Sequence, residues 1–178
     1  MKPIFTIHEG EFLVGDHINR KFGRKYNVWV PTKDNGVDLL VTRRTGAGKP
    51  VGLQVKFSRS FDIPDELTRH VLATSWYTID PKKIRLSQAD LWVFVFMTLR
   101  HERYFVLLPT SELRKRIPRG CGSKWNLYLW AYADGSCYQV RDLNLEGRLN
   151  AAHRGVKDRH RDFSKWFENW KLFETFSR

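Results

Sequence analysis

The most constraining feature of the chain is residues 51–57, VGLQVKF, in which apolar side chains occupy every odd position. A period of two predicts a β-strand with one buried face, so Gln54 and Lys56 are expected to project together from the other face. Residues 35–41, NGVDLLV, form a second apolar run, and the glycine-rich turn at 42–50 ends in proline. Such a turn reverses the chain. The two runs are therefore predicted to pair as an antiparallel ribbon, with Asp38 across from Gln54 and Lys56.

This ribbon would bring a carboxylate, an amide and an ammonium group together, a combination that suits one divalent metal ion. A simpler interpretation stays open for the same residues. Asp38 would then belong to a turn, and Lys56 would extend to water from an edge strand, as most polar strand residues do.

A helix is predicted over residues 10–22, because Val14, Ile18 and Phe22 lie on one stripe and Gly23 follows as a stop signal. Glu11 falls on that same stripe. A carboxylate on the buried side of a helix needs a partner, since an unpaired buried charge is costly. The alternative is that Glu11 lies in the first turn, where acidic residues favour the helix dipole.

Taken together, these segments resemble the PD-(D/E)xK nuclease superfamily, and within it the archaeal Holliday junction resolvases and Mrr-type restriction endonucleases. The likeness rests on GE at 10–11 in the helix, a first strand at 28–30, GVDLLV at 36–41 and LQVK at 53–56. It covers residues 9–60 with motifs and only an order of elements beyond. Val37 replaces the usual proline and Gln54 the usual acidic residue, although glutamine occurs at this position in some active members.

The resemblance implies an α/β fold with a restriction-endonuclease-like core: a central mixed β-sheet flanked by helices in αβββαβ order, with C-terminal additions. We expect one such domain over residues 1–178. The implied function is a metal-dependent endonuclease that hydrolyses DNA phosphodiester bonds of a restriction, repair or junction-resolving type. Cutting both strands of a duplex requires two sites, which suggests a homodimer.

The resemblance also assigns catalytic roles to Glu11, Asp38, Gln54 and Lys56. It implies that Mg²⁺ (or Mn²⁺) is held by Asp38, the Gln54 side-chain oxygen and the Val55 carbonyl, with Glu11 acting through water or a second ion. Lys56 would position or activate the attacking water and stabilise negative charge. A neutral amide contributes less to a divalent cation than a carboxylate does, so Gln54 implies weaker metal binding.

Composition independently indicates a polyanionic partner. The chain carries a formal net charge of +12, and nucleic acid is the obvious partner for it. Arg43, Arg44 and Lys49 occupy the predicted hairpin tip and are the best candidates for DNA phosphate contacts. Further basic clusters end the first helix and crowd residues 148–161, although charge runs are more often solvated faces.

Several other classes of protein are not expected. No apolar run reaches the ~20 residues of a membrane span, and the N-terminus lacks the apolar core of a secretory signal. The two cysteines make no disulfide framework and show no zinc spacing, so we expect a cytoplasmic, thiol-reduced protein. GAGK at 46–49 is followed by proline, which does not fit a phosphate-binding loop, and no nucleotide cofactor is expected.

The remaining elements are predicted from periodicity and turn signals. We expect helices over 64–77 and 110–116, strands over 90–99 and 103–108, and a strand pair at 125–132 and 137–143. Aromatic residues at helical spacing predict a last helix over 159–176, packed on the sheet rather than open to bases.

Two other functions stay open. One is a noncatalytic nucleic-acid-binding protein that kept this fold and lost efficient metal binding at position 54, and it would bind DNA or RNA without cutting it. The other is an interaction protein whose charge only maintains solubility.

Overall fold

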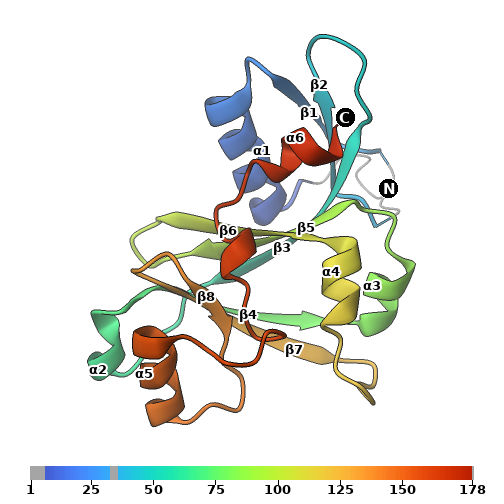
Figure 1. Ribbon diagram of the computed structural model, residues 1–178. Coiled ribbons are helices and arrows are strands. Elements are labelled where there is room, and N and C mark those ends of the chain that lie inside the picture. The colour runs from blue at the N-terminus through green and yellow to red at the C-terminus, as the bar shows by residue number, and fades with distance from the viewer. Residues whose placement is uncertain (1–6, 33–35, 178) are drawn as a thin grey trace, which may run out of the picture.

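The computed structural model describes residues 7–32 and 36–177 as a mixed α/β arrangement of two β-sheets flanked by helices (Figure 1). Asn35 of the predicted ribbon and the first six residues lie outside this range. The helices are α1 (Glu9–Phe22), α2 (Asp65–Thr68), α3 (Pro81–Leu86), α4 (Thr110–Lys115), α5 (Leu145–Arg154), the 3₁₀ helix η1 (Ser164–Trp166) and α6 (Leu172–Phe176). The strands are β1 (Tyr26–Trp29), β2 (Leu39–Arg43), β3 (Val51–Arg59), β4 (Val71–Ile79), β5 (Leu91–Met97), β6 (Arg103–Pro109), β7 (Trp125–Tyr132) and β8 (Cys137–Gln139).

The five-stranded sheet has the order β1-β2-β3-β5-β6 and is mixed. The predicted antiparallel pairing of β2 with β3 is confirmed, with Leu39 opposite Leu53 and Val41 opposite Val51. Strands β3 and β5 run parallel, so a crossover must join them, and it consists of α2, β4 and α3. The three-stranded sheet has the order β4-β7-β8.

The five-stranded sheet separates two apolar cores. On one face, alternate residues of β3 and β5 such as Leu53, Val55 and Val93 pack with α1 and the C-terminal Phe173. On the other face, Trp92 and Phe94 of β5 pack against inward-facing residues of the three-stranded sheet. This period-two division of apolar residues between two faces is what a sheet buried on both sides requires.

The helix predicted over residues 64–77 is wrong. Only α2, Asp65–Thr68, is helical, and β4 follows at Val71. In β4, Ala73, Tyr77 and Ile79 are buried while Trp76 and Thr78 are exposed, which is a strand period rather than a helical one. Pro64 and the acids behind it do start a helix, but the β-branched and aromatic residues that follow favour the sheet.

The C-terminal helix predicted over residues 159–176 is also wrong, although its aromatic residues are core as expected. The segment contains η1 and α6, and Glu168 between them has a φ of 50°. The Glu168 carboxylate accepts the Phe105 N–H at 2.7 Å and the Trp170 Nε1–H at 3.2 Å, and burial raises its pKa. The segment thereby places Phe163 in one core and Trp170 in the other, which one straight helix could not do.

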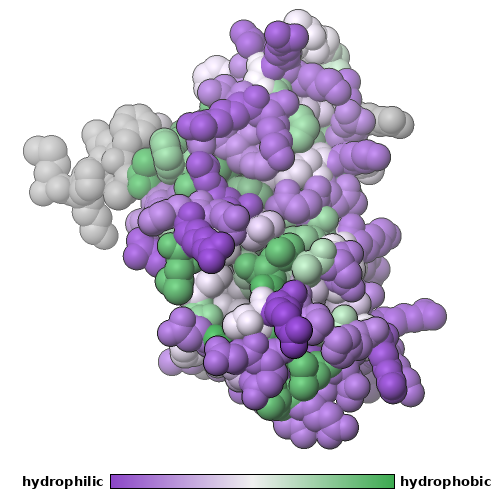
Figure 2. All heavy atoms as spheres, turned by 90° about the vertical axis from the view of Figure 1, so that its left-hand side faces the viewer, coloured by the Kyte–Doolittle hydropathy of each residue, from purple (hydrophilic) through white to green (hydrophobic). Residues whose placement is uncertain are grey.

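Other predictions are confirmed within a residue or two, including α1, α4, β5 and β6. Strand β7 has the predicted bounds, whereas β8 ends at Gln139 rather than Leu143. Helix α5 was not predicted. None of the helices in the described part of the chain is long and apolar enough to cross a membrane. Figure 2 shows one face of the molecule as largely hydrophilic, with its apolar side chains in separate groups.

Candidate functional site

The candidate site lies where the pairing of β2 with β3 ends, a place that we call the β2–β3 fork. The backbone pairing covers Leu39–Val41 and Val51–Leu53. Asp38 extends it through its backbone N–H and its carboxylate. The Asp38 N–H donates to the Leu53 carbonyl at 2.8 Å, and the Val55 N–H donates to Asp38 Oδ2 at 2.6 Å. Among the described residues, no strand pairs with this edge of β3 beyond that point. The edge of β3 is therefore open just after Gln54, and farther along the strand the Ser58 Oγ accepts the Trp76 N–H of β4 at 3.0 Å.

Gln54 and Lys56 project from the face of β3 opposite α1, as the alternation predicted, because Leu53 and Val55 are committed to the core beneath α1. The Gln54 Nε2–H donates to Asp38 Oδ2. Lys56 is half-buried, with its Nζ 5.7 Å from the centre of the Trp92 ring. This distance lies within the range of a cation–π interaction, which helps to fix the ammonium group.

Glu11 reaches the same place from α1. Gly10 lies directly on β3, where a Cβ at this position would come within 2.7 Å of Phe57 Cβ and 3.3 Å of Val55 Cγ1. Only glycine permits this close approach, which carries Glu11 to the open edge of β3. Glu11 Oε2 also accepts the His8 N–H at 3.0 Å, as an N-terminal cap. Both interpretations of Glu11 are thus compatible with its position.

Helix α1 is fixed to the sheet by an ion pair at its middle. Asp16 accepts hydrogen bonds from Arg103 Nη1 at 2.8 Å and from Arg20 Nε at 2.7 Å. The bond from Arg103 and then the bond from Arg20 lower the pKa of Asp16. Because Arg103 belongs to β6, this pair ties the helix that carries Glu11 to the edge strand of the five-stranded sheet opposite β1.

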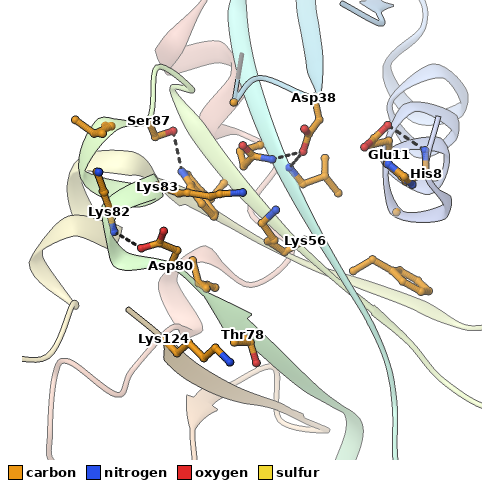
Figure 3. Close-up of a pocket in the computed structure, with 18 of the residues that line it drawn as sticks. His8, Glu11, Asp38, Lys56, Thr78, Asp80, Lys82, Lys83, Ser87 and Lys124 are labelled. Atoms are coloured by element: carbon orange, nitrogen blue, oxygen red, sulfur yellow. Dashed lines mark hydrogen bonds between the residues drawn. The ribbon is translucent and has the colours of Figure 1, made fainter. Parts of the chain in front are cut away.

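One cleft, with a volume of about 960 Å³, is lined by Glu11, Asp38, Gln54, Val55 and Lys56. It is bounded by the start of α1, the β2–β3 fork, α3 with the end of β4, and the segment before β7. Figure 3 shows Lys56 in the middle of the cleft, Asp38 and Glu11 on one side, and α3 on the other. The charged or polar side chains lining it are His8, Glu11, Asp38, Gln54, Lys56, Thr78, Asp80, Lys82, Lys83, Ser87, Ser123 and Lys124.

Sequence reasoning missed the basic residues across the cleft, Lys82, Lys83 and Lys124, all of which are exposed. A signal for the first two was present. Asp80 precedes Pro81, and this pair marks a helix start; the Asp80 Oδ1 accepts the Lys82 N–H at 2.8 Å. The distance in sequence between this helix and β3 gave no indication that they face each other.

The predicted DNA contacts at the hairpin do not line the cleft. Arg43 Nε donates to Ser177 Oγ at 3.1 Å, and Arg44 Nη1 donates to the Gly23 carbonyl at 2.8 Å. Lys49 Nζ pairs with Asp90 Oδ1 at 3.2 Å. The three side chains therefore hold the hairpin against neighbouring segments.

The cleft offers oxygen donors of the kind that Mg²⁺ prefers: the carboxylates of Asp38 and Glu11, the Gln54 amide and the Val55 carbonyl. The described residues contain no group of three or more His, Cys, Asp or Glu side chains placed to hold a metal. An ion here would thus depend on two carboxylates and neutral oxygens. Gln54 presents its Nε2 to Asp38, so its amide would have to turn over to offer oxygen.

Comparison with protein-family models, with curated proteins and with solved structures finds no match for this chain.

Proposed function

We propose that the protein is a metal-dependent endonuclease that hydrolyses DNA phosphodiester bonds at this cleft. One observation carries the proposal. Glu11, Asp38, Gln54 and Lys56, which come from a helix and from both arms of a strand fork, all line the same cleft. In order and spacing along the chain these residues resemble the nuclease motif, with Gln54 in place of its second acidic residue.

The residues of the cleft divide the chemical work between them. A divalent cation, when bound, supplies positive charge that polarises a phosphate and lowers the pKa of water. Asp38, Glu11 and the Gln54 and Val55 oxygens would hold it. Lys56 stabilises the negative charge that develops on the phosphate during hydrolysis, and its half-buried position strengthens that interaction. Lys82, Lys83 and Lys124 neutralise phosphates along the bound strand.

The order of elements supports the finer fold assignment. Helix α1 is followed by three antiparallel strands, then by a crossover and the parallel strand β5. This order resembles the αβββαβ order of a restriction-endonuclease-like core, with additional elements inside the crossover. The crossover here contains β4 between two short helices, and with β7 and β8 it builds the three-stranded sheet that forms one wall of the cleft.

A specific contact favours a second candidate, a noncatalytic nucleic-acid-binding protein. The Gln54 amide already donates to the Asp38 carboxylate, an arrangement that satisfies a partly buried charge without any metal. In that case the lysines across the cleft would bind phosphates and no bond would be cut.

Cleavage assays separate the two candidates. Purified protein is incubated with plasmid, linear and four-way-junction DNA over a titration of Mg²⁺ or Mn²⁺, with EDTA controls. We expect wild type to cut in the presence of metal, and Asp38→Ala to lose cleavage while retaining DNA binding. Asp62→Ala, at an exposed carboxylate that does not line the cleft, is the matched control and should cut like wild type. No metal-dependent cleavage by wild type on any substrate would favour the binding protein.

A further inference from the structure

Trp76 on β4 is about half exposed, at 52%, and stacks on its cross-strand partner Tyr128 of β7. The two ring centres are 5.5 Å apart and the planes differ by 13°. Cross-strand aromatic pairs stabilise sheets, but a buried pair of rings would stabilise the sheet more than an exposed one. Trp130 and Tyr132, further along the same face of β7, are each only 1% exposed.

The difference arises from what covers this face. Trp130 and Tyr132 form a third apolar cluster with Leu67 of α2 and Ala151 of α5. Trp76 lies at the other, uncovered part of the face. Strand β4 is an edge strand of the three-stranded sheet, so no strand of that sheet flanks Trp76 on the side away from Tyr128. One face of the indole is thus supported by tyrosine. On the side of β4 away from Tyr128 the neighbouring strand is β3, whose Ser58 Oγ accepts the Trp76 N–H at 3.0 Å, and the Trp76 side chain stays exposed beside it.

The pair of Trp76 and Tyr128 adjoins the cleft. The next outward residue of β4 is Thr78, which lines the cleft and donates from Oγ1 to Asn126 Oδ1 at 2.9 Å. Two residues along a strand span roughly 6.6–6.8 Å, about the length of two nucleotide steps along one nucleic-acid strand. Lys124, just before β7, lines the cleft beside Thr78 (Figure 3). An aromatic surface therefore continues directly from a basic one.

We propose that Trp76, backed by Tyr128, is a stacking platform for an unpaired nucleobase of the strand whose phosphates enter the cleft. This inference rests on the proposed function in so far as the cleft receives phosphates. Aromatic side chains beside a basic groove are the usual means of holding single strands, and they accept every base because each has a π face. Bases within an intact duplex already stack on one another and are not free to do so. The substrate class that follows is single-stranded nucleic acid, or branched nucleic acid with unpaired nucleotides.

The test is equilibrium binding in EDTA, which prevents metal-dependent cleavage. The probes are a short single-stranded DNA, the same DNA with abasic sites, its duplex, and the RNA of the same sequence. Stacking contributes about 1–3 kcal/mol per base, so Trp76→Ala should weaken single-strand binding about 5- to 150-fold. Trp76→Phe should retain most of the affinity. Trp29→Ala, which removes another exposed tryptophan, at 55%, outside the cleft, is the matched control and should bind like wild type.

The abasic probe separates stacking from charge. If Trp76 stacks on a base, wild type should bind the abasic strand less tightly than the normal strand, and Trp76→Ala should bind both equally. The duplex should be insensitive to the substitution. Unchanged single-strand affinity in Trp76→Ala, or an equal loss of affinity for normal and abasic strands, would overturn the proposal. The RNA arm shows which sugar the site accepts.

Failure of this inference is distinguishable from failure of the proposed function. If wild type cuts DNA with metal while Trp76→Ala binds single strands normally, the stacking platform is refuted and the nuclease stands. If no cleavage occurs while Trp76→Ala shows the base-dependent loss, the platform stands on a noncatalytic protein.

Discussion

Replacing Gln54 with glutamate tests whether a metal ion binds at the fork between β2 and β3. The substitution should have opposite effects on the stability of the protein in the absence and in the presence of metal. Gln54 now donates to a carboxylate oxygen of Asp38. Gln54→Glu removes that donor and puts a second carboxylate beside the first. In the absence of metal the variant should be less stable than wild type, and in the presence of metal it should bind the ion more tightly.

The size of the effect follows from the contact that is lost. A hydrogen bond to a charged group contributes about 1.5–3 kcal/mol, and 1 kcal/mol shifts the melting temperature of a domain this long by roughly 2–4 °C. We therefore expect the variant to melt about 3–12 °C lower in EDTA. Repulsion from Asp38 raises the pKa of the new carboxyl above its value in the unfolded chain. The folded state then binds more protons than the unfolded state, so the deficit should grow as pH rises above about 4.3, the ordinary pKa of glutamate.

Metal should reverse the deficit. An ion that binds only the folded state at 100 times its dissociation constant adds about 2.7 kcal/mol. Melting curves with a Mg²⁺ or Mn²⁺ titration measure this directly. Gln88→Glu is the control, since it adds the same charge at an exposed position that does not line the cleft. An equal melting temperature for Gln54→Glu and wild type in EDTA would refute the expected loss of the contact. A metal shift no larger than that of Gln88→Glu would refute a metal site at the fork.

Three further results are expected. Gly10→Ala forces a Cβ to within 2.7 Å of Phe57 Cβ, so it should lower the free energy of unfolding by about 1–3 kcal/mol in denaturant titrations and reduce cleavage by displacing α1. Burial lowers the pKa of His17 to about 4, so between pH 6.5 and 4 the folded state binds fewer protons than the unfolded state. The free energy of unfolding should therefore fall as pH drops through this range, and His17→Phe should flatten that dependence. Lys83→Glu should weaken binding of all DNA sequences alike and reduce its salt dependence, whereas Arg44→Glu, outside the cleft, should affect binding less.

The local part of this architecture could be predicted from the sequence because it is encoded in short periods. Alternation over residues 51–57 predicted β3 and the shared face of Gln54 and Lys56, and the apolar stripe ending at Gly23 predicted α1. The close approach of α1 to β3 was not anticipated, since nothing in Gly10 alone reveals that it meets Phe57.

The rest depended on contacts between distant segments. Residues 64–77 begin with good helix signals, but Trp76 and its neighbours are held as a strand by β7, about fifty residues later in the chain. The aromatic residues at 163–173 have helical spacing. The Glu168 carboxylate accepts the Phe105 N–H, however, and the aromatic residues before and after Glu168 lie in two separate cores. The lysines of α3 reach the cleft because the crossover between β3 and β5, which contains α3, places that helix opposite β3.

The most direct test of the account is the rate of DNA cleavage under single-turnover conditions, with protein in saturating excess and Mg²⁺ or Mn²⁺ present. Saturation removes differences in binding, so only the chemical step is measured. Lys56→Met, which keeps the length of the side chain and removes its charge, should slow that step by about 100-fold or more. Lys83→Met, which removes a charge across the same cleft, should leave the rate unchanged. No cleavage by wild type, or equal rates for wild type and Lys56→Met, would contradict the account.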